Sequence, residues 1–408
     1  MRQILRKIIP EPIRKMKIQY IEKKSLKDGA RIKKQVILKD PGKPLIVVFV
    51  VYMPQEWNSL EAVYLMMKKD SRFKAYLLVT PHESILSDGR TMSSYDFFSR
   101  FGNDVIDAKL ENGWYNVADL HPDIIFRQES FDDNFPSEYS GKKLAEIAKL
   151  YYIPYAYTNT AKHIPMEFHL GFISYCKTVF AANTETYNYL LTLKKTYREL
   201  ADLSVYDIGF PRYDLLGDVE LEDAPIRHFL WIPRYSLDFE GNDGTNFFKY
   251  KKNIIKYFSE NKNIELRIRP HPLMFKEFVK RGAMSSEDVE SFINEINGIG
   301  NITLDNEMDY MKTFDWSDAM IADHSSLNFE YLAMGKPVIY CNDDAEKSLG
   351  EMSECVYDGT DWEKLKDALD CLLKNADVLK DKRTNIAIKA NRSMNRHCAE
   401  EIINICFE

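Results

Sequence analysis

The sequence is poor in the features that mark metal-binding, secreted and membrane-spanning proteins. Its six cysteines form no C-x-x-C pair and no His/Cys spacing typical of zinc, so we expect reduced, buried, structural cysteines. The longest apolar run, residues 45–52, is far too short to span a bilayer. The basic N-terminus, interrupted by Pro10 and Pro12, does not resemble a secretory signal. These absences favour a cytoplasmic protein.

The sequence also lacks an Asp-x-Asp motif, which metal-dependent sugar transferases use to hold a diphosphate through Mn²⁺. Asp343 and Asp344 follow an expected strand, but adjacent side chains point apart. His163 and His169 lie six residues apart around Pro165, a spacing too irregular for a metal pair on one helix face. We therefore expect chemistry that needs no metal or other cofactor.

The net charge of −7 hides an asymmetry along the chain. Residues 1–40 carry a charge of +9, which leaves −16 for the remaining 368 residues. An acidic body argues against nucleic acid as a partner. The basic arm has two short apolar faces, formed by Ile4, Leu5, Ile8 and Ile9 and by Ile13, Met16, Tyr20 and Ile21. The arm is therefore an anchor on an anionic membrane surface, a solvated basic tail, or a helix packed on the acidic body.

At 408 residues the chain is too long for one ordinary core, and two domains are expected. Strand-like runs alternate with helix-like runs, which is the pattern of parallel α/β layers. Helices are expected over residues 57–69, 137–150 and 184–194 of the first half. The expected strands are residues 45–52, 73–79, 124–127, 153–158, 179–182, 229–232, 264–268, 302–304, 320–322 and 338–340.

We interpret this pattern as two doubly wound, Rossmann-like domains that face a cleft. The predicted parts are a basic amphipathic arm (1–40), an acceptor-side domain (41–205), a donor-binding domain (206–383) and a C-terminal helix (384–408) that is a candidate to cross back to the first domain. Ligands in such sheets bind beyond the carboxyl ends of the strands.

Residues 319–341 predict a strand, a tight turn and a helix that together can hold a phosphate. The first N–H groups of a helix are unpaired and its dipole is positive at that end. Ser325 and Ser326 can add hydroxyl donors, or act only as N-caps. Glu330, one turn later, is a candidate to bind a ribose hydroxyl or a solvated helix residue. Asp323 is expected to shape the loop by accepting backbone N–H groups.

His271 lies between two prolines at the end of another expected strand. This frame fixes its backbone, and the side chain is a candidate proton carrier or donor to a transferred phosphate, or else a turn histidine that caps the sheet. Arg234 and Arg269 flank the same edge, where a guanidinium can bind phosphate oxygens or form surface salt bridges. In the turn-rich segment 209–214, Arg212 is expected to be structural and to bond to Asp214 or a carbonyl.

These residues occur in a fixed order of motifs over about residues 205–345. The motifs are Gly209-x-Pro211-Arg212-x-Asp214, Ile232-Pro233-Arg234, Arg269-x-His271-Pro272, Asp323-x-Ser325-Ser326-x-x-Phe329-Glu330 and Lys336-Pro337. The order resembles the CDP-glycerol glycerophosphotransferase family, the teichoic-acid and related polymer-forming enzymes with a GT-B-type fold. The family usually has Ser before the Asp of the phosphate turn, where this chain has Ala322.

The resemblance implies transfer of a polyol phosphate, such as glycerol phosphate, from a CDP-activated donor to a membrane-linked glycan or polymer, with release of CMP. It also implies work at the inner face of the cell membrane. Family members carry a His-Gly-Thr-type motif whose histidine is thought to be the general base. This chain has none, and His163 is the candidate replacement beside His271. Two alternatives stay open: an inverting glycosyltransferase that uses a nucleotide sugar, and a non-catalytic subunit of a polymer-assembly complex.

Overall fold

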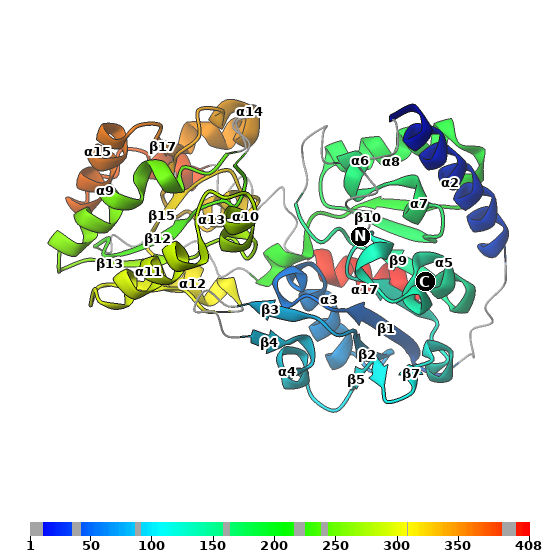
Figure 1. The fold of residues 1–408 in the computed structure, drawn as a ribbon. Coiled ribbons are helices and arrows are strands. Elements are labelled where there is room, and N and C mark those ends of the chain that lie inside the picture. The colour runs from blue at the N-terminus through cyan, green and yellow to red at the C-terminus, as the bar shows by residue number, and fades with distance from the viewer. Residues whose placement is uncertain are drawn as a thin grey trace. The chain divides into compact units, whose positions relative to one another are not determined.

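The structure, a computed structural model, describes residues 11–34, 42–85, 91–157, 164–215, 225–237, 244–307, 309–385 and 397–408. They form two compact units, each built on a parallel β-sheet. The first unit comprises Met1–His82, Ser94–Leu215 and Asn395–Glu408, and the second comprises Glu83–Ser93 and Leu216–Met394. The chain therefore completes the second unit before it returns to the first (Figure 1).

The sheet of the first unit has seven described strands, all parallel, in the order β11-β10-β9-β8-β1-β2-β5. The strand β1 (Leu45–Val51) consists of valine, leucine, isoleucine and phenylalanine and is buried at nearly every position, as expected for a parallel strand covered on both faces. The others are β2 (Phe73–Val79), β5 (Val105–Asp107), β8 (Ile124–Arg127), β9 (Lys149–Tyr152), β10 (Thr178–Ala181) and β11 (Ser204–Asp207). Their carboxyl ends meet at one edge.

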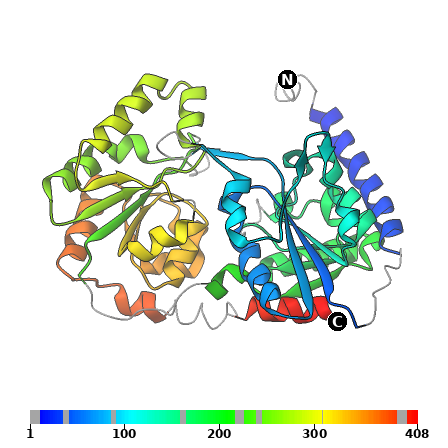
Figure 2. The same cartoon turned by 90° about the horizontal axis from the view of Figure 1, so that it is seen from below.

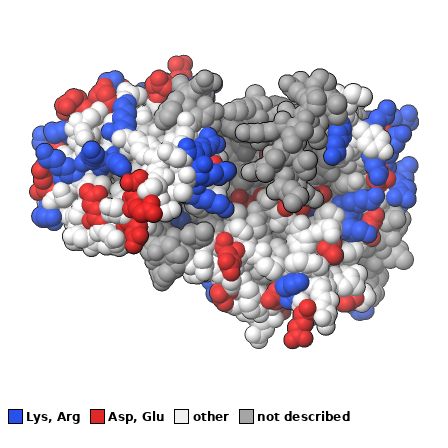
Figure 3. Space-filling view, in the orientation of Figure 1, with Lys and Arg blue, Asp and Glu red and all other residues white. Residues whose placement is uncertain are grey.

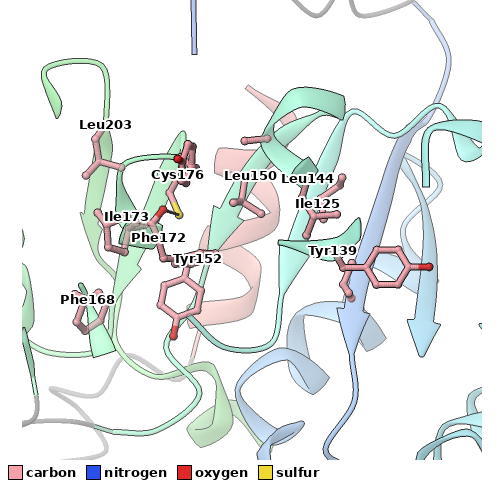
Figure 4. Close-up of a cluster of buried hydrophobic side chains, with 14 of the residues drawn as sticks. Ile125, Tyr139, Leu144, Leu150, Tyr152, Phe168, Phe172, Ile173, Cys176 and Leu203 are labelled. Atoms are coloured by element: carbon pink, nitrogen blue, oxygen red, sulfur yellow. Dashed lines mark hydrogen bonds between the residues drawn. The ribbon is translucent and has the colours of Figure 1, made fainter. Parts of the chain in front are cut away.

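Helices cover both faces of this sheet. On one face, α5 (Gly141–Ile147), α7 (Leu170–Ile173) and α8 (Thr184–Thr196) pack over alternate strand residues in a core that Figure 4 shows in part. On the other face, α3 (Asn58–Lys69) packs its Tyr64 edge-on against Phe49 of β1. The C-terminal helix α17 (Cys398–Phe407) lies against α3. The alternation of strand side chains thus divides the apolar interior into two layers.

The helix α2 (Glu11–Ile32) belongs to the first unit through its C-terminal half, where Leu26 and Ile32 are buried. Gly29 lies so close to α7 that a Cβ there would sit 2.0 Å from the carbonyl oxygen of Ser174, which excludes every other residue type without a shift. Asp28 also forms an ion pair with Lys142, whose Nζ lies 2.7 Å from Oδ2 of Asp28. Within the described ranges, no helix is both long and apolar enough to cross a membrane.

The sheet of the second unit has six described parallel strands in the order β14-β13-β12-β15-β16-β17. They are β12 (His228–Ile232), β13 (Glu265–Ile268), β14 (Ile302–Leu304), β15 (Ala319–Ala322), β16 (Val338–Tyr340) and β17 (Val356–Asp358). The helices around it are α9 (Phe247–Glu260), α10 (Met274–Lys280), α11 (Ser286–Asn297), α12 (Tyr310–Trp316), α13 (Leu327–Ala333), α14 (Ala345–Leu349) and α15 (Trp362–Leu373) (Figure 2).

Most expected strands form within a residue of their predicted bounds, but the strand expected over residues 153–158 is wrong. The chain forms β9 over Lys149–Tyr152 instead, and the helix expected over residues 137–150 shortens to α5. Pro154 has no N–H to donate to a neighbouring strand, so the aromatic run after it cannot continue the ladder. Leu150 fits the helical spacing of the preceding residues, so the start of the strand was assigned to the helix.

Candidate functional site

The predicted donor-side residues lie at the carboxyl ends of three neighbouring strands of the second unit. Arg234 follows β12, His271 follows β13 and Ser325 follows β15. The strands β13 and β15 pair with β12 on its two sides, so the three loops meet at one edge of the sheet. This edge is the candidate functional site.

Asp323 ties these loops together. Only 1% of it is exposed, and its carboxylate accepts hydrogen bonds from the N–H of Arg234 at 2.9 Å and from the hydroxyl of Thr245 at 3.1 Å. The backbone and side-chain amides of Asn246 add bonds of 3.2 and 2.9 Å. Burial raises the pKa of Asp323, and these donors oppose the rise. The carboxylate is thus occupied by the protein and fixes the turn.

Arg234 contributes a positive charge to this edge. Its Nη1 donates to the carbonyl oxygen of His324 at 2.6 Å, which holds the guanidinium against the turn after β15. Its backbone is held by Asp323, so both ends of the residue are fixed by the same turn. An arginine held in this way loses little further side-chain entropy when it binds a phosphate.

The imidazole of His271 has a defined tautomer. Its Nδ1 accepts a hydrogen bond from the N–H of Leu273 at 3.1 Å, so the neutral ring carries its hydrogen on Nε2. The ring lies 4.4 Å from that of Tyr235, and loss of solvent around it, together with the charge of Arg234, lowers the pKa of His271 to about 4. The residue as a whole is nevertheless exposed. His271 is therefore a neutral Nε2–H donor near neutral pH.

The turn after β15 leaves donors open in a different place from the one predicted. The N–H groups of Leu327, Asn328 and Phe329, the first of α13, are engaged by Ser325 Oγ, Ser325 O and Ser326 O at 3.2 Å each. In contrast, the N–H groups of both serines and the Ser326 hydroxyl donate to no acceptor in the described part of the chain. The serines, both half-buried, therefore carry the open donors of this turn.

Two other predicted donor-binding residues are held by protein partners. Nη1 of Arg269 donates to Asp305 at 2.5 Å and to the carbonyl of Glu307 at 2.8 Å. Glu330 is buried and accepts a hydrogen bond of 2.6 Å from the hydroxyl of Tyr310, so it is not the solvated helix residue that was the alternative. Their binding of a donor stays a prediction.

The two histidines of the first half, His163 and His169, give no evidence for a role as general base. His163 lies outside the described residues. His169, the second histidine of that zone, donates from Nε2 to the carbonyl of Ser130 at 3.1 Å and stacks on Phe131. Burial lowers the pKa of His169. Its ring is thus built into the loop after β8.

Of the two partners predicted for Arg212, Asp214 bonds elsewhere, and a carbonyl partner stays a prediction. Arg212 is buried and forms an ion pair with Glu61 of α3, with Nη1 and Oε2 3.8 Å apart. Asp214 instead accepts the first N–H groups of α17, from Cys398 at 3.3 Å and Ala399 at 2.7 Å. A carboxylate at a helix N-terminus complements the helix dipole. The partner lies 184 residues away in the sequence, so local spacing did not reveal it.

The sequence did not single out a group of buried carboxyls at the carboxyl edge of the first sheet. Glu56 follows β1, Glu129 follows β8 and Glu167 lies on the short helix α6 (Ile164–Glu167). The signal that could have found the first two is an acidic residue within a few positions of the end of an apolar strand. Among the described residues, no group of three or more His, Cys, Asp or Glu side chains could hold a metal ion.

Comparison with known protein families and structures adds to this geometry. Residues 177–358 match the family described as CDP-Glycerol:Poly(glycerophosphate) glycerophosphotransferase. This segment includes β12 to β17 and every residue of the edge described above. The match agrees, over these residues, with the family that the motifs predicted. No curated protein matches the sequence.

Solved structures share the fold at low sequence identity. The UDP-GlcNAc 2-epimerase from Neisseria meningitidis bound to UDP-GlcNAc is 12% identical with a TM-score of 0.55, over 88% of this chain and 98% of that one. The epimerase from Methanocaldococcus jannaschii is 14% identical with a TM-score of 0.52, over 88% and 99%. The wall teichoic acid polymerase TagF, soaked with CDPG, is 14% identical with a TM-score of 0.51, over 96% of each chain. The predicted α/β, GT-B-like fold is confirmed.

Proposed function

We propose that the chain transfers a polyol phosphate from a CDP-activated donor to a hydroxyl of a membrane-linked acceptor and releases CMP. The observation that carries this proposal is the edge of the second sheet, which lies within the segment that matches the family. It brings together the guanidinium of Arg234, the Nε2–H of His271 and the open donors of Ser325 and Ser326. All of these groups present hydrogen or positive charge, which suits a diphosphate.

The reaction follows from the chemistry of such a donor. The acceptor oxygen loses its proton and attacks the phosphorus that bears the polyol. The bond from that phosphorus to the CMP oxygen breaks, and CMP leaves with the bonding electrons. Phosphoryl transfer depends mainly on positioning and on stabilisation of charge on the phosphate oxygens. Arg234 and the two serines are the groups that we expect to supply this stabilisation.

For His271 the tautomer favours one of the two predicted roles. A general base needs an unprotonated nitrogen that faces its substrate, but Nδ1 is occupied by the N–H of Leu273 and Nε2 carries the hydrogen. We propose that His271 donates a hydrogen bond to a phosphate oxygen and leaves the acceptor proton to another group.

The decisive experiment identifies the nucleotide released from each of several donors. Purified chain is incubated with CDP-glycerol, CDP-ribitol, UDP-sugars or CMP-sugars, with a lipid-linked glycerol phosphate as acceptor. We expect CMP from a CDP-polyol together with a lengthened acceptor. Release of UDP from a UDP-sugar would instead support the inverting glycosyltransferase, and tight donor binding without turnover would support the non-catalytic subunit.

The surface of α2 supports a role at an anionic membrane. In its N-terminal half Met16 and Tyr20 are each 69% exposed, and Ile18 and Ile21 are also exposed. Exposed basic residues accompany them, namely Lys17, Lys23, Lys24, Lys27 and Arg31. Figure 3 shows Lys and Arg side chains gathered over this helix at the right of the view. Apolar side chains beside cations suit a bilayer surface that carries anionic lipid.

Vesicle co-sedimentation tests this anchor. The full chain is expected to pellet with phosphatidylglycerol vesicles at low salt and to be released at high salt. The double variant Met16→Ser with Tyr20→Ser should bind less, since it removes exposed apolar area without touching the buried half of α2. Val378→Ser is the matched control, because Val378 is 77% exposed on the second unit. Equal binding by both variants would rule out α2 as the anchor.

A further inference from the structure

His324, in the turn after β15, is a titratable residue to which the proposed function assigns no role. It stands between Asp323, which fixes the turn, and Ser325, which carries open donors. Its carbonyl oxygen accepts from Nη1 of Arg234 at 2.6 Å, and its N–H donates to Oδ1 of Asn342 at 3.0 Å. The backbone of His324 is therefore held on both sides at the carboxyl edge of the second sheet.

The side chain of His324 contacts the next strand of the sheet, β16. Its Nδ1 lies 3.4 Å from the hydroxyl oxygen of Tyr340, the last residue of β16. That hydroxyl donates to Oδ1 of Asp344 at 3.0 Å, and Oδ2 of Asp344 accepts from the hydroxyl of Ser348. The imidazole, the phenol and the carboxylate thus form a chain of hydrogen bonds that lies wholly within the second unit.

This chain of hydrogen bonds sets the tautomer of the imidazole. A tyrosine hydroxyl has one hydrogen, and that of Tyr340 goes to Asp344, whose carboxylate can only accept. Tyr340 keeps its hydrogen because burial, together with the charge of Asp344, raises the pKa of the hydroxyl. The contact between Nδ1 and the Tyr340 oxygen therefore takes its hydrogen from Nδ1. The neutral ring of His324 carries its lone pair on Nε2.

His324 and His271 are thus opposite tautomers at the same edge. Nδ1 of His271 accepts from the N–H of Leu273, so its Nε2 carries hydrogen and can donate to a phosphate oxygen. Nε2 of the half-buried His324 carries a lone pair, which repels a phosphate oxygen and attracts the hydrogen of a hydroxyl. The proposed reaction brings one such hydroxyl to the phosphorus, namely that of the acceptor.

We propose that His324 is the general base of the transfer and that its Nε2 takes the proton of the acceptor hydroxyl. The proposal rests on the proposed function, because the hydroxyl belongs to the acceptor of that reaction. The acceptor O–H bond breaks, a bond forms between the proton and Nε2, and the oxygen keeps the electron pair with which it attacks phosphorus. CMP leaves with the electrons of the bond that breaks, and the imidazolium gives its proton to water before the next turnover.

The charges around His324 suit this proton transfer. Tyr340 accepts from Nδ1 and donates to Asp344, whose negative charge stabilises the imidazolium as it forms. Arg234 opposes that charge, but the buried carboxylate of Asp323 lies beside both residues. Tyr340 and Asp344 are positioning residues, and His324 alone meets the substrate. A single nitrogen adds little to acceptor affinity, so the role should appear in kcat rather than in KM.

Steady-state kinetics of CMP release test the base directly. His324→Gln is assayed with CDP-glycerol as donor and glycerol phosphate oligomers as acceptor, and His228→Gln is the control because His228 lies at the amino end of β12. We expect kcat to fall roughly 10²-fold in His324→Gln and to stay unchanged in the control. Calorimetric affinity for CDP-glycerol should match that of wild type in both variants, which also shows that they are folded.

Variants of the two positioning residues separate proton transfer from packing. Tyr340→Phe keeps the ring and Asp344→Asn keeps the side-chain shape, while Asp343→Asn is the control because Asp343 is exposed next to Asp344. The first two should each lower kcat about tenfold. Their acid limb of activity should also move to lower pH, because the imidazolium loses the carboxylate or the hydroxyl that stabilises it. The control should change neither quantity.

Nitrogen-15 NMR of labelled histidine tests the two tautomers without turnover. In the full chain near neutral pH, His324 should carry its hydrogen on Nδ1 and His271 should carry it on Nε2. The signals are assigned by their loss in His324→Gln and in His271→Gln. Tyr340→Phe should convert His324 alone to a mixture of tautomers. Hydrogen on Nε2 of His324 in wild type would overturn the proposal.

The outcomes distinguish this proposal from the proposed function. Turnover of His324→Gln within about threefold of wild type would show that another group is the base and would leave the proposed function standing. A large loss in His163→Gln instead would assign the proton to that residue. Lower donor affinity in His324→Gln would place His324 on the phosphate and also overturn the proposal. A wild type that binds CDP-polyols but never releases CMP would overturn both.

Discussion

The carboxyl edges of the two sheets are built alike and carry opposite chemistry. In each, loops after parallel strands meet at one edge, and one buried polar side chain joins neighbouring loops: Gln128 in the first unit and Asp323 in the second. The second edge presents cations and N–H or O–H donors around Arg234 and His271. The first presents buried carboxyls around Glu129.

In both sheets topology sets where the loops meet, while a few side chains set the chemistry of the edge. A set of donors and positive charge suits phosphate oxygens. A buried carboxyl that is protonated can both donate and accept hydrogen bonds, which suits neutral hydroxyls. Phosphate would be repelled at the first edge and polyols would gain little at the second. The predictions below test this division of roles.

The largest effect is expected for His271→Ala. Loss of a donor that stabilises charge in the transition state should lower kcat about 10²- to 10³-fold in a steady-state assay of CMP release. His271→Gln, which offers an amide N–H, should recover part of the loss. His228→Ala is the control, since His228 lies at the amino end of β12, away from this edge. Activity of His271→Ala within a few-fold of wild type would remove His271 from the donor site.

The titration of His271 sharpens the same point. Its pKa of about 4 lies below the ordinary value, so the ring is neutral across the neutral range. A histidine with a lowered pKa in the fold stabilises the protein above its ordinary pKa, and that contribution is lost as pH falls towards 4. We therefore expect donor affinity to depend on pH between about 6 and 8 in the same way in wild type and in His271→Gln.

A smaller loss is expected when Ser325→Ala and Ser326→Ala are combined. Each lost hydrogen bond to a charged phosphate is worth roughly 1.5–3 kcal/mol, and the backbone N–H groups that remain should limit the total. Calorimetry should show CDP-glycerol affinity lowered about tenfold or more. Ser286→Ala, at an exposed helix position of the same unit, should bind like wild type. Unchanged affinity in the double variant would exclude the turn as the phosphate site.

At the first edge, Glu167→Gln should change stability in a pH-dependent way. Burial raises the pKa of Glu167 to about 8. A raised carboxyl pKa stabilises the fold below the ordinary value, and this contribution falls as pH rises through 8, by at most about 1.4 kcal/mol per pH unit. Glutamine does not titrate, so thermal melts should show the melting temperature of the variant rising relative to that of wild type as pH increases from about 5 to 8. A pH-independent difference would mean that Glu167 is not neutral in the fold.

The smallest effect is expected from chelation. Because the second edge supplies its own cationic and N–H groups for a diphosphate, EDTA should leave the rate of CMP release unchanged. Assays before and after dialysis against EDTA, with Mg²⁺ or Mn²⁺ added back, provide the measurement. A loss that either ion restores would show that the charge of Arg234 and the serine donors are insufficient without a metal.

The sequence predicted the elements whose signal is local. Leu45–Val51 is apolar throughout and Ile302–Leu304 lies between clear turns, so their strands could be placed. The edge strands β5, β11 and β17 are only partly buried and each ends in an aspartate, so no apolar run marks them in the sequence, and they were missed. They are strands because a neighbour in the sheet pairs with them, which is tertiary information.

The candidate site, like the fold, could be predicted only where its signal is local. The donor edge could be predicted because each of its residues belongs to a motif next to a strand end, as Arg269-Pro270-His271 does. The buried carboxyls of the first sheet could not, because Glu56 and Glu129 are 73 positions apart in the sequence and neither belongs to a recognised motif. Only the parallel pairing of β1 with β8 brings their loops together. The open donors of Ser325 and Ser326 likewise depend on backbone bonding that no spacing reveals.

The capping of α17 by Asp214 has a consequence for the order of folding. This helix buries Ile402 and Ile403 in the first unit, yet it leaves the ribosome after all of the second unit has been made. During synthesis the α3 side of the first unit therefore lacks its last helix until about 180 further residues have been made. Until then the Asp214 carboxylate has no helix N-terminus to cap. Ribosome-bound chains should consequently bind chaperones on the first unit longer than its early position in the sequence would suggest.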